Sequence, residues 1–286
     1  MAGNELRDTF VAVMTPSHDG RHCGNDVGSV LDLSAQLQGP GVRIQVFLHQ
    51  GESLVTRACN DCVARFPGRP AWTHLCWIDS DFGFSTQAAL RLLRGGHDAA
   101  AGAYPLKTAD WPYEGLAAGT PRERFETLRA RFPVNCVPPG EPGETRLCVQ
   151  PDGFLRVSEA RTGCMLIARS AFDRPIAACP DLRHTPDTVG LENNGLFHGL
   201  FDLMVDRQSR RHLSGDHALC RRCSAIGREI HVDARSSLSH QGPKTYRGSF
   251  AGSLAAALPR AVGSPNGTRL HLTGAEHLVT DATPAL

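Results

Sequence analysis

Short apolar runs alternate with segments of helical spacing through the first third of the chain, and this alternation restricts the fold more than any other feature. The strand-like runs are Phe10–Met14, Val42–Leu48, Leu75–Ile78 and Ala99–Tyr104, and the helix-like segments are Leu54–Phe66 and Thr86–Leu93. Strands separated by helices of this length predict βαβ units, and therefore an α/β fold with a mostly parallel sheet flanked by helices. In such sheets the ligand binds at the carboxyl ends of the strands.

The rest of the sequence divides into three less regular parts. Residues 108–160 are rich in Pro, Gly and charge, and predict an irregular insertion or lid with one helix at Arg122–Phe132. Residues 161–250 predict a strand at Thr162–Ala168, a helix at Asp216–Ile226 and a strand at Glu229–Val232. Residues 251–286 lose periodicity and predict a poorly ordered tail. We therefore expect one domain over residues 9–250, with residues 9–107 as its first half.

The charge balance argues against an obligate nucleic-acid binder. The 286 residues include 30 Lys and Arg against 29 Asp and Glu, and 41% of them are hydrophobic, as in a soluble globular protein. No uncharged apolar run approaches the roughly 18 residues of a membrane span, and the first residues lack the pattern of a signal peptide. We therefore expect a cytoplasmic protein without a membrane span.

Two pairs of the ten cysteines have CxxC spacing, Cys59 with Cys62 and Cys220 with Cys223. Two such pairs can form a four-thiolate zinc site. Both pairs lie in helix-like stretches without the Gly-rich turn expected around zinc. Buried thiols are therefore the preferred interpretation, and metal binding is the alternative.

The segment Trp77-Ile78-Asp79-Ser80-Asp81 places two carboxylates directly after an apolar strand. Residues two apart on an extended chain project to the same side, so both carboxylates can reach one point beyond the strand end. Two such charges repel unless a cation lies between them, and Mg²⁺ or Mn²⁺ takes oxygen ligands and bridges carboxylates to phosphates. A solvated acidic turn is the alternative that this motif alone leaves open.

Further motifs follow the acidic pair in a fixed order. They are Ala101-Gly102-Ala103-Tyr104-Pro105-Leu106-Lys107, then Leu213-Ser214-Gly215-Asp216 before a helix, then Leu238-Ser239-His240-Gln241-Gly242 with Lys244, Tyr246 and Gly248. Together with the DxD pair they resemble the nucleotide-sugar half, the xED element and the closing HxG...YxG segment of GT-A fold glycosyltransferases. The resemblance is to bacterial and phage family-2-like enzymes in particular, and it covers roughly residues 9–250.

This resemblance implies a GT-A, Rossmann-like fold that transfers a sugar from a nucleoside diphosphate sugar to an acceptor hydroxyl. It implies that Mn²⁺ or Mg²⁺ binds Asp81 together with Asp79, and that His240 closes the site as a third ligand. The metal would act as a Lewis acid that stabilises the departing diphosphate. For His240, a role as a surface or hydrogen-bonded residue is the alternative.

If the anomeric centre inverts, the resemblance implies that Asp216 is the base that takes the acceptor proton. Asp216 opens a helix, where backbone N–H groups can orient a carboxylate, and stabilisation of the helix end is its alternative role. The family usually has an acidic residue where this chain has Gly215. Retention of configuration is the mechanistic alternative, and it would leave Asp216 without a base role.

The resemblance also implies residues that contact the two substrates. On the donor side they are Thr15, Pro16, Ser17, Arg57, Asn60, Ser80, Lys107, Lys244 and Tyr246, with Cys59 standing where the RxRN-like element has its second Arg. On the acceptor side they are Thr162, Gly163 and Gly215. Trp111 and Tyr113 are aromatic residues in a polar loop and can stack on a sugar ring. The alternative roles are solvent exposure for the Lys and Arg side chains, a tight turn for the glycine-containing segment, and packing of the lid or the core for the aromatic residues.

Other functions stay open at this point. A nucleotidyltransferase also uses metal-bound carboxylates, but the Gly-rich phosphate loop of such enzymes is missing from Thr15–Gly28. An inactive sugar-binding protein on the same fold is a second alternative, which Gly215 supports. The acceptor can be a saccharide, a small molecule or a modified DNA base. Arg122–Arg131 and Arg207–His212 can line a phosphate track for DNA, although ordinary solvated helix faces are the preferred interpretation.

Overall fold

The computed structural model describes residues 6, 8–37, 41–108, 115, 118–135, 143–187, 195–207, 209–263 and 268–278. The helices are α1 (Gly24–Leu37), α2 (Val55–Arg65), α3 (Thr86–Gly95), α4 (Arg122–Leu128), α5 (Ser170–Ala178), α6 (Gly215–Ala225) and α7 (Phe250–Ala255). Shorter 3₁₀ turns lie at Pro180–Leu182, Pro259–Val262 and Ala275–Leu278. None of the helices in these ranges combines the length and the apolar composition that crossing a bilayer requires.

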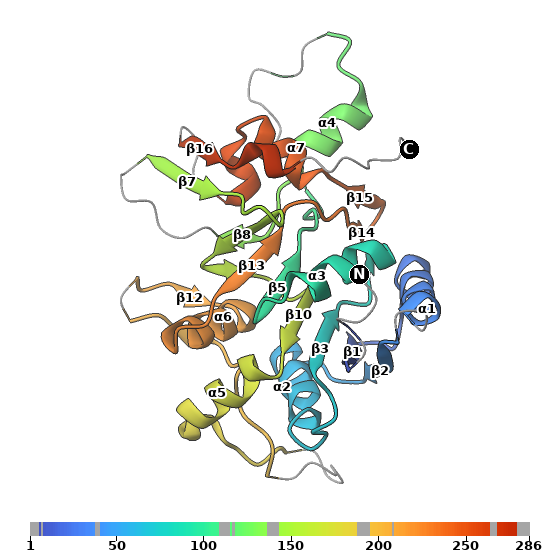
Figure 1. Cartoon of the computed structure of the whole chain (residues 1–286), viewed down its shortest axis with the longest axis vertical. Coiled ribbons are helices and arrows are strands. Elements are labelled where there is room, and N and C mark those ends of the chain that lie inside the picture. The colour runs from blue at the N-terminus through green and yellow to red at the C-terminus, as the bar shows by residue number, and fades with distance from the viewer. Residues whose placement is uncertain are drawn as a thin grey trace.

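A seven-stranded sheet with the order β2-β1-β3-β10-β5-β13-β8 forms the centre of the molecule (Figure 1). Its strands are β1 (Phe10–Ser17), β2 (Arg43–Gln50), β3 (His74–Ile78), β5 (Ala99–Gly102), β8 (Phe154–Val157), β10 (Cys164–Ala168) and β13 (Ile230–Asp233). β1 is parallel to β2 and β3, and β13 is parallel to β5. β10 is antiparallel to both β3 and β5, so β3 and β5 point the same way. The carboxyl ends of β1, β2, β3, β5 and β13 therefore lie along one edge, and the expected α/β fold is confirmed.

Short strands extend this framework. They are β4 (Phe82–Gly83), β6 (Val134–Asn135), β7 (Glu144–Cys148), β9 (Glu159–Ala160), β11 (Met204–Val205), β12 (His212–Leu213), β14 (Ser239–Gln241), β15 (Thr245–Arg247) and β16 (Arg269–Thr273). β4, β14 and β15 form a three-stranded sheet, while β6 pairs with β9, β7 with β16 and β11 with β12. The sheet of β4, β14 and β15 starts at the carboxyl end of β3, where the candidate site lies.

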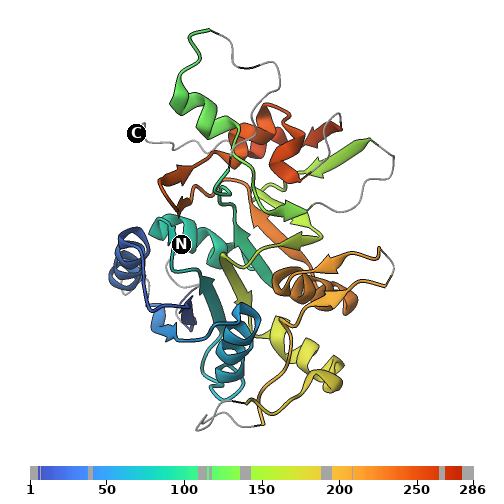
Figure 2. The ribbon, with the colours of Figure 1, turned by 180° about the vertical axis from the view of Figure 1, so that it is seen from behind.

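Successive side chains of a strand point to opposite faces of the sheet and fill two apolar layers. On one face, Val13 shares a buried cluster with Leu92 of α3, and α1 covers the same face. On the other face, the adjacent Met14 shares a cluster with Leu219 of α6, together with α2 and α5 (Figure 2). Burying one such Leu stabilises the fold by roughly 1.5–3 kcal/mol. The sheet is thus covered on both sides, and its carboxyl edge is left for the site.

The elements expected from periodicity form close to the expected residues. The expected strands and the helices α2, α3 and α6 begin within two residues of their predicted starts. α4 ends at Leu128, short of the predicted Phe132. α1 has no counterpart among the predicted helices, because Gly24 and Gly28 lower its helix propensity and burial against the sheet stabilises it instead.

Two parts of the chain differ from the expectation. Residues 108–160, expected to be an irregular insertion, supply β8, which pairs with β13 and extends the main sheet. The expected loose tail includes α7 and β16, and there Phe250, Leu254 and Leu270 are buried while β16 lies parallel to β7. α7 has 6 residues and β16 has 5, too few for a hydrophobic period to be visible in the sequence.

Two histidine rings stack near the amino end of β13. The ring centroids of His97 and His231 are 3.8 Å apart, with an interplanar angle of 16°. His231 is buried, and its Nδ1 has no hydrogen-bond partner among the residues that the structure describes. Burial, and then the charge of His97, lower the pKa of His231 to about 4.

We expect the free energy of unfolding to fall as the pH drops from about 7 to about 4. The unfolded chain protonates His231 near its ordinary pKa of 6.5, whereas the folded chain does so only near 4, so acid favours the unfolded state between these values. The difference corresponds to at most about 3 kcal/mol. Urea unfolding of the wild type and of His231→Phe across this pH range measures the effect, because the variant lacks the titrating ring. Equal pH dependence in the two proteins would contradict the assignment.

Candidate functional site

The two carboxylates of the DxD segment lie at the carboxyl end of β3. The chain passes from Asp79 through Asp81 directly into β4, whose partner is β14. In that pairing His240 lies opposite Phe82, and the N–H of Gln241 donates to the carbonyl oxygen of Asp81 at 2.8 Å. Backbone pairing therefore brings the HxG segment beside the DxD segment.

Asp81 contacts two side chains that can carry positive charge. Lys107 Nζ is 2.6 Å from Asp81 Oδ2, and His240 Nε2 is 3.4 Å from the same oxygen. Burial raises the pKa of Asp81, but hydrogen bonds from His240 and Lys107 and the charges of both residues outweigh it, so the pKa lies below its ordinary value. Asp81 is therefore an ionised carboxylate at neutral pH.

The ring of His240 is held with Nε2 toward Asp81. Its Nδ1 lies 3.0 Å from the carbonyl oxygen of Pro105, which can only accept, so the hydrogen-bond geometry assigns a proton to Nδ1. The ring also stacks on Phe82, with centroids 4.3 Å apart. With Nδ1 held in this way, Nε2 is the ring nitrogen that faces Asp81, an arrangement also found in metal-binding histidines whose other nitrogen donates to a carbonyl.

Asp79 lies among other acidic groups. Trp77 Nε1–H donates to Asp79 Oδ1 at 3.2 Å. Burial and the charges of Asp216 and Asp81 raise the pKa of Asp79 to about 7, in spite of the hydrogen bond from Trp77. A cation beside Asp79 would favour its ionised form.

Asp216 reaches the same region from α6. It lies in the first turn of that helix, where the helix dipole favours a carboxylate. The buried Thr162 donates its Oγ1–H to Asp216 Oδ1 at 3.0 Å. Asp216 Oδ2 receives no hydrogen bond from any residue in the described ranges. After burial, the charge of Asp216 is the largest cause of the raised pKa of Asp79 and of Cys59. The helix α2, which carries Cys59, therefore also borders this site.

Packing accounts for two glycines that the sequence places on the acceptor side. A Cβ on Gly163 would lie 2.8 Å from the ring of Phe82. A Cβ on Gly215 would lie 2.5 Å from the carbonyl oxygen of Phe201 and 3.2 Å from Thr56 Cγ2. The backbone thus leaves no room for the acidic residue that the resembling family has at this position. A contact between either glycine and an acceptor stays a prediction.

Within the described part of the chain, no group of three or more His, Cys, Asp or Glu side chains is arranged to hold a metal ion. Asp81 and His240 approach each other to 3.4 Å and offer two possible ligands. A cation at this pair would take its remaining ligands from water or substrate, because Mg²⁺ is usually held by one or two carboxylates plus phosphate oxygens.

The CxxC pairs are buried free thiols on the inner faces of α2 and α6. Burial raises the pKa of Cys62 and of Cys223 to about 12. Cys220 Sγ–H donates to the carbonyl oxygen of Ala160 at 3.3 Å. All four thiols are thus buried, as the preferred interpretation expects, and metal binding stays a prediction.

A pocket of about 280 Å³ lies on the Lys107 side of Asp81, and its lining includes Lys107, Glu126, Lys244, Tyr246 and Arg247. Lys244 Nζ is 2.6 Å from Glu126 Oε1 and 5.1 Å from the ring centroid of Tyr246. Lys107 reaches Asp81 across Gly242, where a Cβ would lie 3.0 Å from Lys107 Cδ. The glycine of the HxG segment therefore makes room for Lys107, and the pocket collects more positive than negative charge.

The predicted nucleoside turn is the last part of β1, formed by Thr15, Pro16 and Ser17. Thr15 Oγ1 lies 3.5 Å from His22 Nδ1. In the loop that follows, the N–H of Cys23 donates to the carbonyl oxygen of Ser80 at 2.8 Å. This bond joins the loop to the DxD segment, next to the predicted metal ligands.

Arg57 and Asn60 line a different pocket, of about 330 Å³, at the start of α2. Arg57 Nη2 donates to Glu52 Oε1 at 2.8 Å. Asn60 is buried, and its amide donates to Asp202 Oδ1 at 2.8 Å while its oxygen accepts from the N–H of Phe201 at 2.9 Å. Asn60 therefore holds the loop before β11, and its contact with a nucleotide stays a prediction.

Two predicted residues lie outside the described ranges, and two pairs in the structure were not predicted from the sequence. Trp111 and Tyr113 lie outside the residues that the structure describes. His22 Nδ1 and Asp26 Oδ2 form a buried pair at 2.8 Å beside the end of β1, and their spacing of four residues is a signal that the sequence contained. Glu159 and Arg211 form a second unpredicted pair, and no local pattern connects two residues that are 52 positions apart.

No protein-family model and no curated protein sequence matches this chain. Similar solved structures include A197 from STIV, with 10% identity, a TM-score of 0.43, and coverage of 82% of this chain and 86% of that chain. A 4-diphosphocytidyl-2C-methyl-D-erythritol synthase from Anaerococcus prevotii has 8% identity, a TM-score of 0.32, and coverage of 78% and 98%. A putative glucose-1-phosphate thymidylyltransferase from Bacillus anthracis has 10% identity, a TM-score of 0.36, and coverage of 92% and 100%. Likenesses this distant carry no argument about activity.

We expect Gly215→Ala to destabilise the protein by about 1–3 kcal/mol, because the new Cβ meets a backbone carbonyl that cannot move freely. Thermal unfolding of the variant measures this loss. Gly28→Ala in α1 is the matched control, since its Cβ meets nothing within 4 Å and alanine should stabilise the helix by roughly 0.5–1 kcal/mol. A Gly215→Ala protein as stable as the wild type would show that the absence of an acidic residue here has another cause.

Proposed function

We propose that this chain is a metal-dependent glycosyltransferase, which moves a sugar from a nucleoside diphosphate sugar to an acceptor hydroxyl with inversion at the anomeric carbon. The observation that carries the proposal is the contact of Asp81 with His240 at 3.4 Å, directly after Asp79 at the end of β3, with Asp216 near enough for its charge to raise the pKa of Asp79. A solvated acidic turn would explain Asp79 and Asp81 alone. It would not explain why a histidine whose Nδ1 is held by a backbone carbonyl directs its Nε2 at Asp81.

Asp81 and His240 are the residues that would hold the divalent cation, with Asp79 as the predicted third ligand. The fit is supported by the ionised state of Asp81 and by the contact of His240 Nδ1 with Pro105, which directs Nε2 toward Asp81; a cation would take the place of the proton between Nε2 and that carboxylate. Oxygen and imidazole ligands both suit Mn²⁺, and two protein ligands suffice when phosphates complete the shell. The bound ion would supply Lewis-acid stabilisation of the negative charge that the leaving diphosphate acquires.

The pocket beside Lys107 suits the diphosphate part of the donor. Lys107, Lys244 and Arg247 bring three positive charges to its lining against the single carboxylate of Glu126. Lys107 lies between Asp81 and the pocket, so its flexible side chain can move its ammonium group from Asp81 to a phosphate oxygen. Tyr246 and the Lys244 side chain, which also line this pocket, would then contact the donor.

Asp216 would act as the base. Thr162 holds Oδ1, so Oδ2 is the oxygen available to the acceptor O–H. As the acceptor oxygen bonds to the anomeric carbon, the bond from that carbon to the phosphate oxygen breaks, and its electron pair leaves with the diphosphate. The acceptor proton passes to Asp216 Oδ2. This single displacement inverts the anomeric carbon, whereas retention would leave Asp216 without a proton to take.

Product analysis with a panel of nucleotide sugars and Mn²⁺ tests the proposal. A thermal-shift screen with and without Mn²⁺ first selects donors, because a ligand of the folded state raises its melting temperature. A glycosyltransferase then releases nucleoside diphosphate, by transfer or by slow hydrolysis, whereas a nucleotidyltransferase supplied with pyrophosphate converts the nucleotide sugar to nucleoside triphosphate and sugar 1-phosphate. If donors bind but neither product is released, the chain is a sugar-binding protein and the proposal is wrong.

We expect Asp81→Ala to abolish turnover while the protein stays folded, because no other ionised carboxylate contacts His240 in the described ranges.

We expect Asp216→Asn to lower kcat by at least about 10²-fold with donor binding nearly unchanged, since the amide keeps the shape but cannot accept the proton. Initial rates, donor titration and circular dichroism measure these effects. Activity of Asp216→Asn within about tenfold of wild type would remove the base role and favour retention.

We expect Lys107→Met to tighten Mn²⁺ binding in the absence of donor by roughly 3–10-fold, because the ammonium group no longer competes for Asp81. Methionine keeps the apolar stem over Gly242. Electron paramagnetic resonance titration of free Mn²⁺ measures the affinity. Lys244→Met is the control, since Lys244 pairs with Glu126 and not with Asp81, and its Mn²⁺ affinity should match the wild type. Unchanged affinity in Lys107→Met would show that no cation binds at Asp81.

A further inference from the structure

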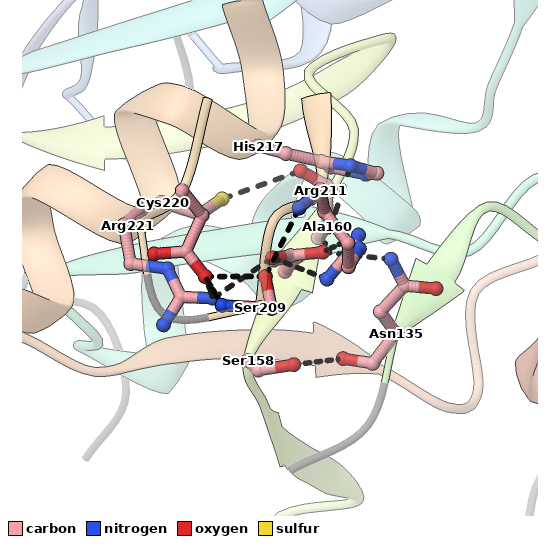
Figure 3. A network of polar contacts seen from close by, with 10 residues as sticks. Asn135, Ser158, Ala160, Ser209, Arg211, His217, Cys220 and Arg221 are labelled. Carbon is pink, nitrogen blue, oxygen red and sulfur yellow. Dashed lines mark hydrogen bonds and ion pairs between the residues drawn. The ribbon is translucent and has the colours of Figure 1, made fainter. Parts of the chain in front are cut away.

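A buried carboxylate that the proposed reaction does not use lies on β9, next to α6. The side chain of Glu159 is only 1% exposed. Arg211 donates to it through both ends of the guanidinium group, from Nη1 to Oε1 at 3.0 Å and from Nη2 to Oε2 at 2.8 Å. Asn135 Nδ2 adds a third hydrogen bond at 2.7 Å. Arg211 and Asn135, both labelled in Figure 3, come from different segments, and each donates to Glu159.

Residues of α6 and of the β11–β12 hairpin complete the network around Glu159. His217 Nδ1 and Arg221 Nη2, both on α6, lie 3.6 Å from the Glu159 oxygens. Arg221 Nη2 also lies 3.7 Å from Asp206 Oδ2. The carboxylate of Asp206 in turn accepts from the N–H of Ser209 at 2.9 Å, which closes the hairpin (Figure 3). The network therefore joins β6, β9, the hairpin and α6.

Stability alone is a weak reason for this arrangement. Burial raises the pKa of Glu159, but hydrogen bonds from Arg211 and Asn135, and the charges of His217 and Arg211, bring it below its ordinary value, so Glu159 is ionised. Taking such a charge out of water costs several kcal/mol, and apolar replacements of buried ion pairs are often as stable. What a bidentate Arg–carboxylate contact adds is a fixed geometry.

Three short stretches of chain lead from this network to the Asp216 carboxylate. Thr162, which donates to Asp216 at 3.0 Å, comes three residues after Glu159. Arg211 leads through β12 into the start of α6, where Asp216 lies. His217, beside Glu159, is the residue that follows Asp216. Because three stretches of chain connect the network to Asp216, a movement of Glu159 would displace both Asp216 and Thr162, its hydrogen-bond donor.

We propose that Glu159 is a positioning residue, which holds the Asp216 carboxylate and Thr162 in register for the acceptor hydroxyl. The network fixes β9, the hairpin and the first turns of α6 relative to one another, and so sets where Asp216 Oδ2 lies. This inference rests on the proposed function for its catalytic consequence. Its structural consequence, the Thr162–Asp216 contact, can be observed without any activity.

Glu159→Gln tests the inference, because glutamine keeps the length of the side chain but turns a hydrogen-bond donor toward Arg211 or Asn135. A displacement of about 1 Å at a reacting group can cost about 10²-fold in rate. We therefore expect kcat to fall at least about tenfold while the Kd for the donor stays within about twofold. We also expect a crystal structure of the variant to show Thr162 Oγ1 and Asp216 Oδ1 beyond hydrogen-bond distance.

Asp98→Asn is the matched control. Asp98 pairs with Arg228 at 2.7 Å and is also partly buried, but it precedes β5 and so lies at the amino edge of the sheet, away from Asp216. This variant should lose stability as Glu159→Gln does, yet keep its kcat and the Thr162–Asp216 contact. A general loss of stability would instead lower the activity of both variants together, and that result would overturn the positioning role.

Arg211→Lys serves if Glu159→Gln does not fold, since lysine keeps the positive charge but loses the bidentate contact. It should lower kcat in the same direction, again without weakening donor binding. A variant of either kind that keeps the Thr162–Asp216 distance and its kcat would overturn the inference. If the wild type transfers no sugar, the proposed function fails separately, and the crystal structures of Glu159→Gln and Asp98→Asn still decide whether Glu159 positions Asp216.

Discussion

Repulsion among carboxylates gathered at the end of one buried strand is the constraint on which the whole site depends. Asp79 and Asp81 follow β3, and Asp216 comes to meet them from α6. Lys107 and His240 balance Asp81, and the start of α6 with Thr162 balances Asp216. Asp79 has only a tryptophan N–H, and its pKa rises to about 7. This incomplete balance of charge is the reason we propose that a cation binds beside these carboxylates.

The two sides of the site are supported by different kinds of interaction. On the side proposed for the donor, backbone pairing of β4 with β14 places His240 beside Asp81, and this pairing depends little on the identity of side chains. On the side proposed for the acceptor, we infer that Asp216 is positioned by the side-chain network around Glu159. Backbone hydrogen bonds tolerate substitution, whereas a buried carboxylate that loses a partner leaves an uncompensated charge. We therefore expect single substitutions to disturb the proposed acceptor side more than the proposed donor side.

Much of the fold followed from local patterns, because buried strands and amphipathic helices leave a hydrophobic period in the sequence. β1, β3, β5 and α3 form where that period predicts them. The DxD pair was found because two carboxylates two residues apart, directly after an apolar strand, can reach one point beyond the strand end. α1, β8 and β16 were missed, because short elements and glycine-containing helices are stabilised by tertiary contacts that leave no local pattern. Asn60 was expected at the nucleotide, but both ends of its amide bind the loop at Phe201 and Asp202, a pairing that only the folded chain reveals.

The sequence by itself determined that this chain forms a mostly parallel α/β sheet and that acidic residues end its third strand, because hydrophobic periodicity and residue order are local properties. Tertiary structure alone decided that Lys107 rests on Asp81, that Gly215 has no room for a side chain, and that Glu159 binds Arg211. Each of these depends on distances between segments separated by many residues. Such distances arise only when the sheet order and the packing of both layers are in place, and no local pattern encodes them.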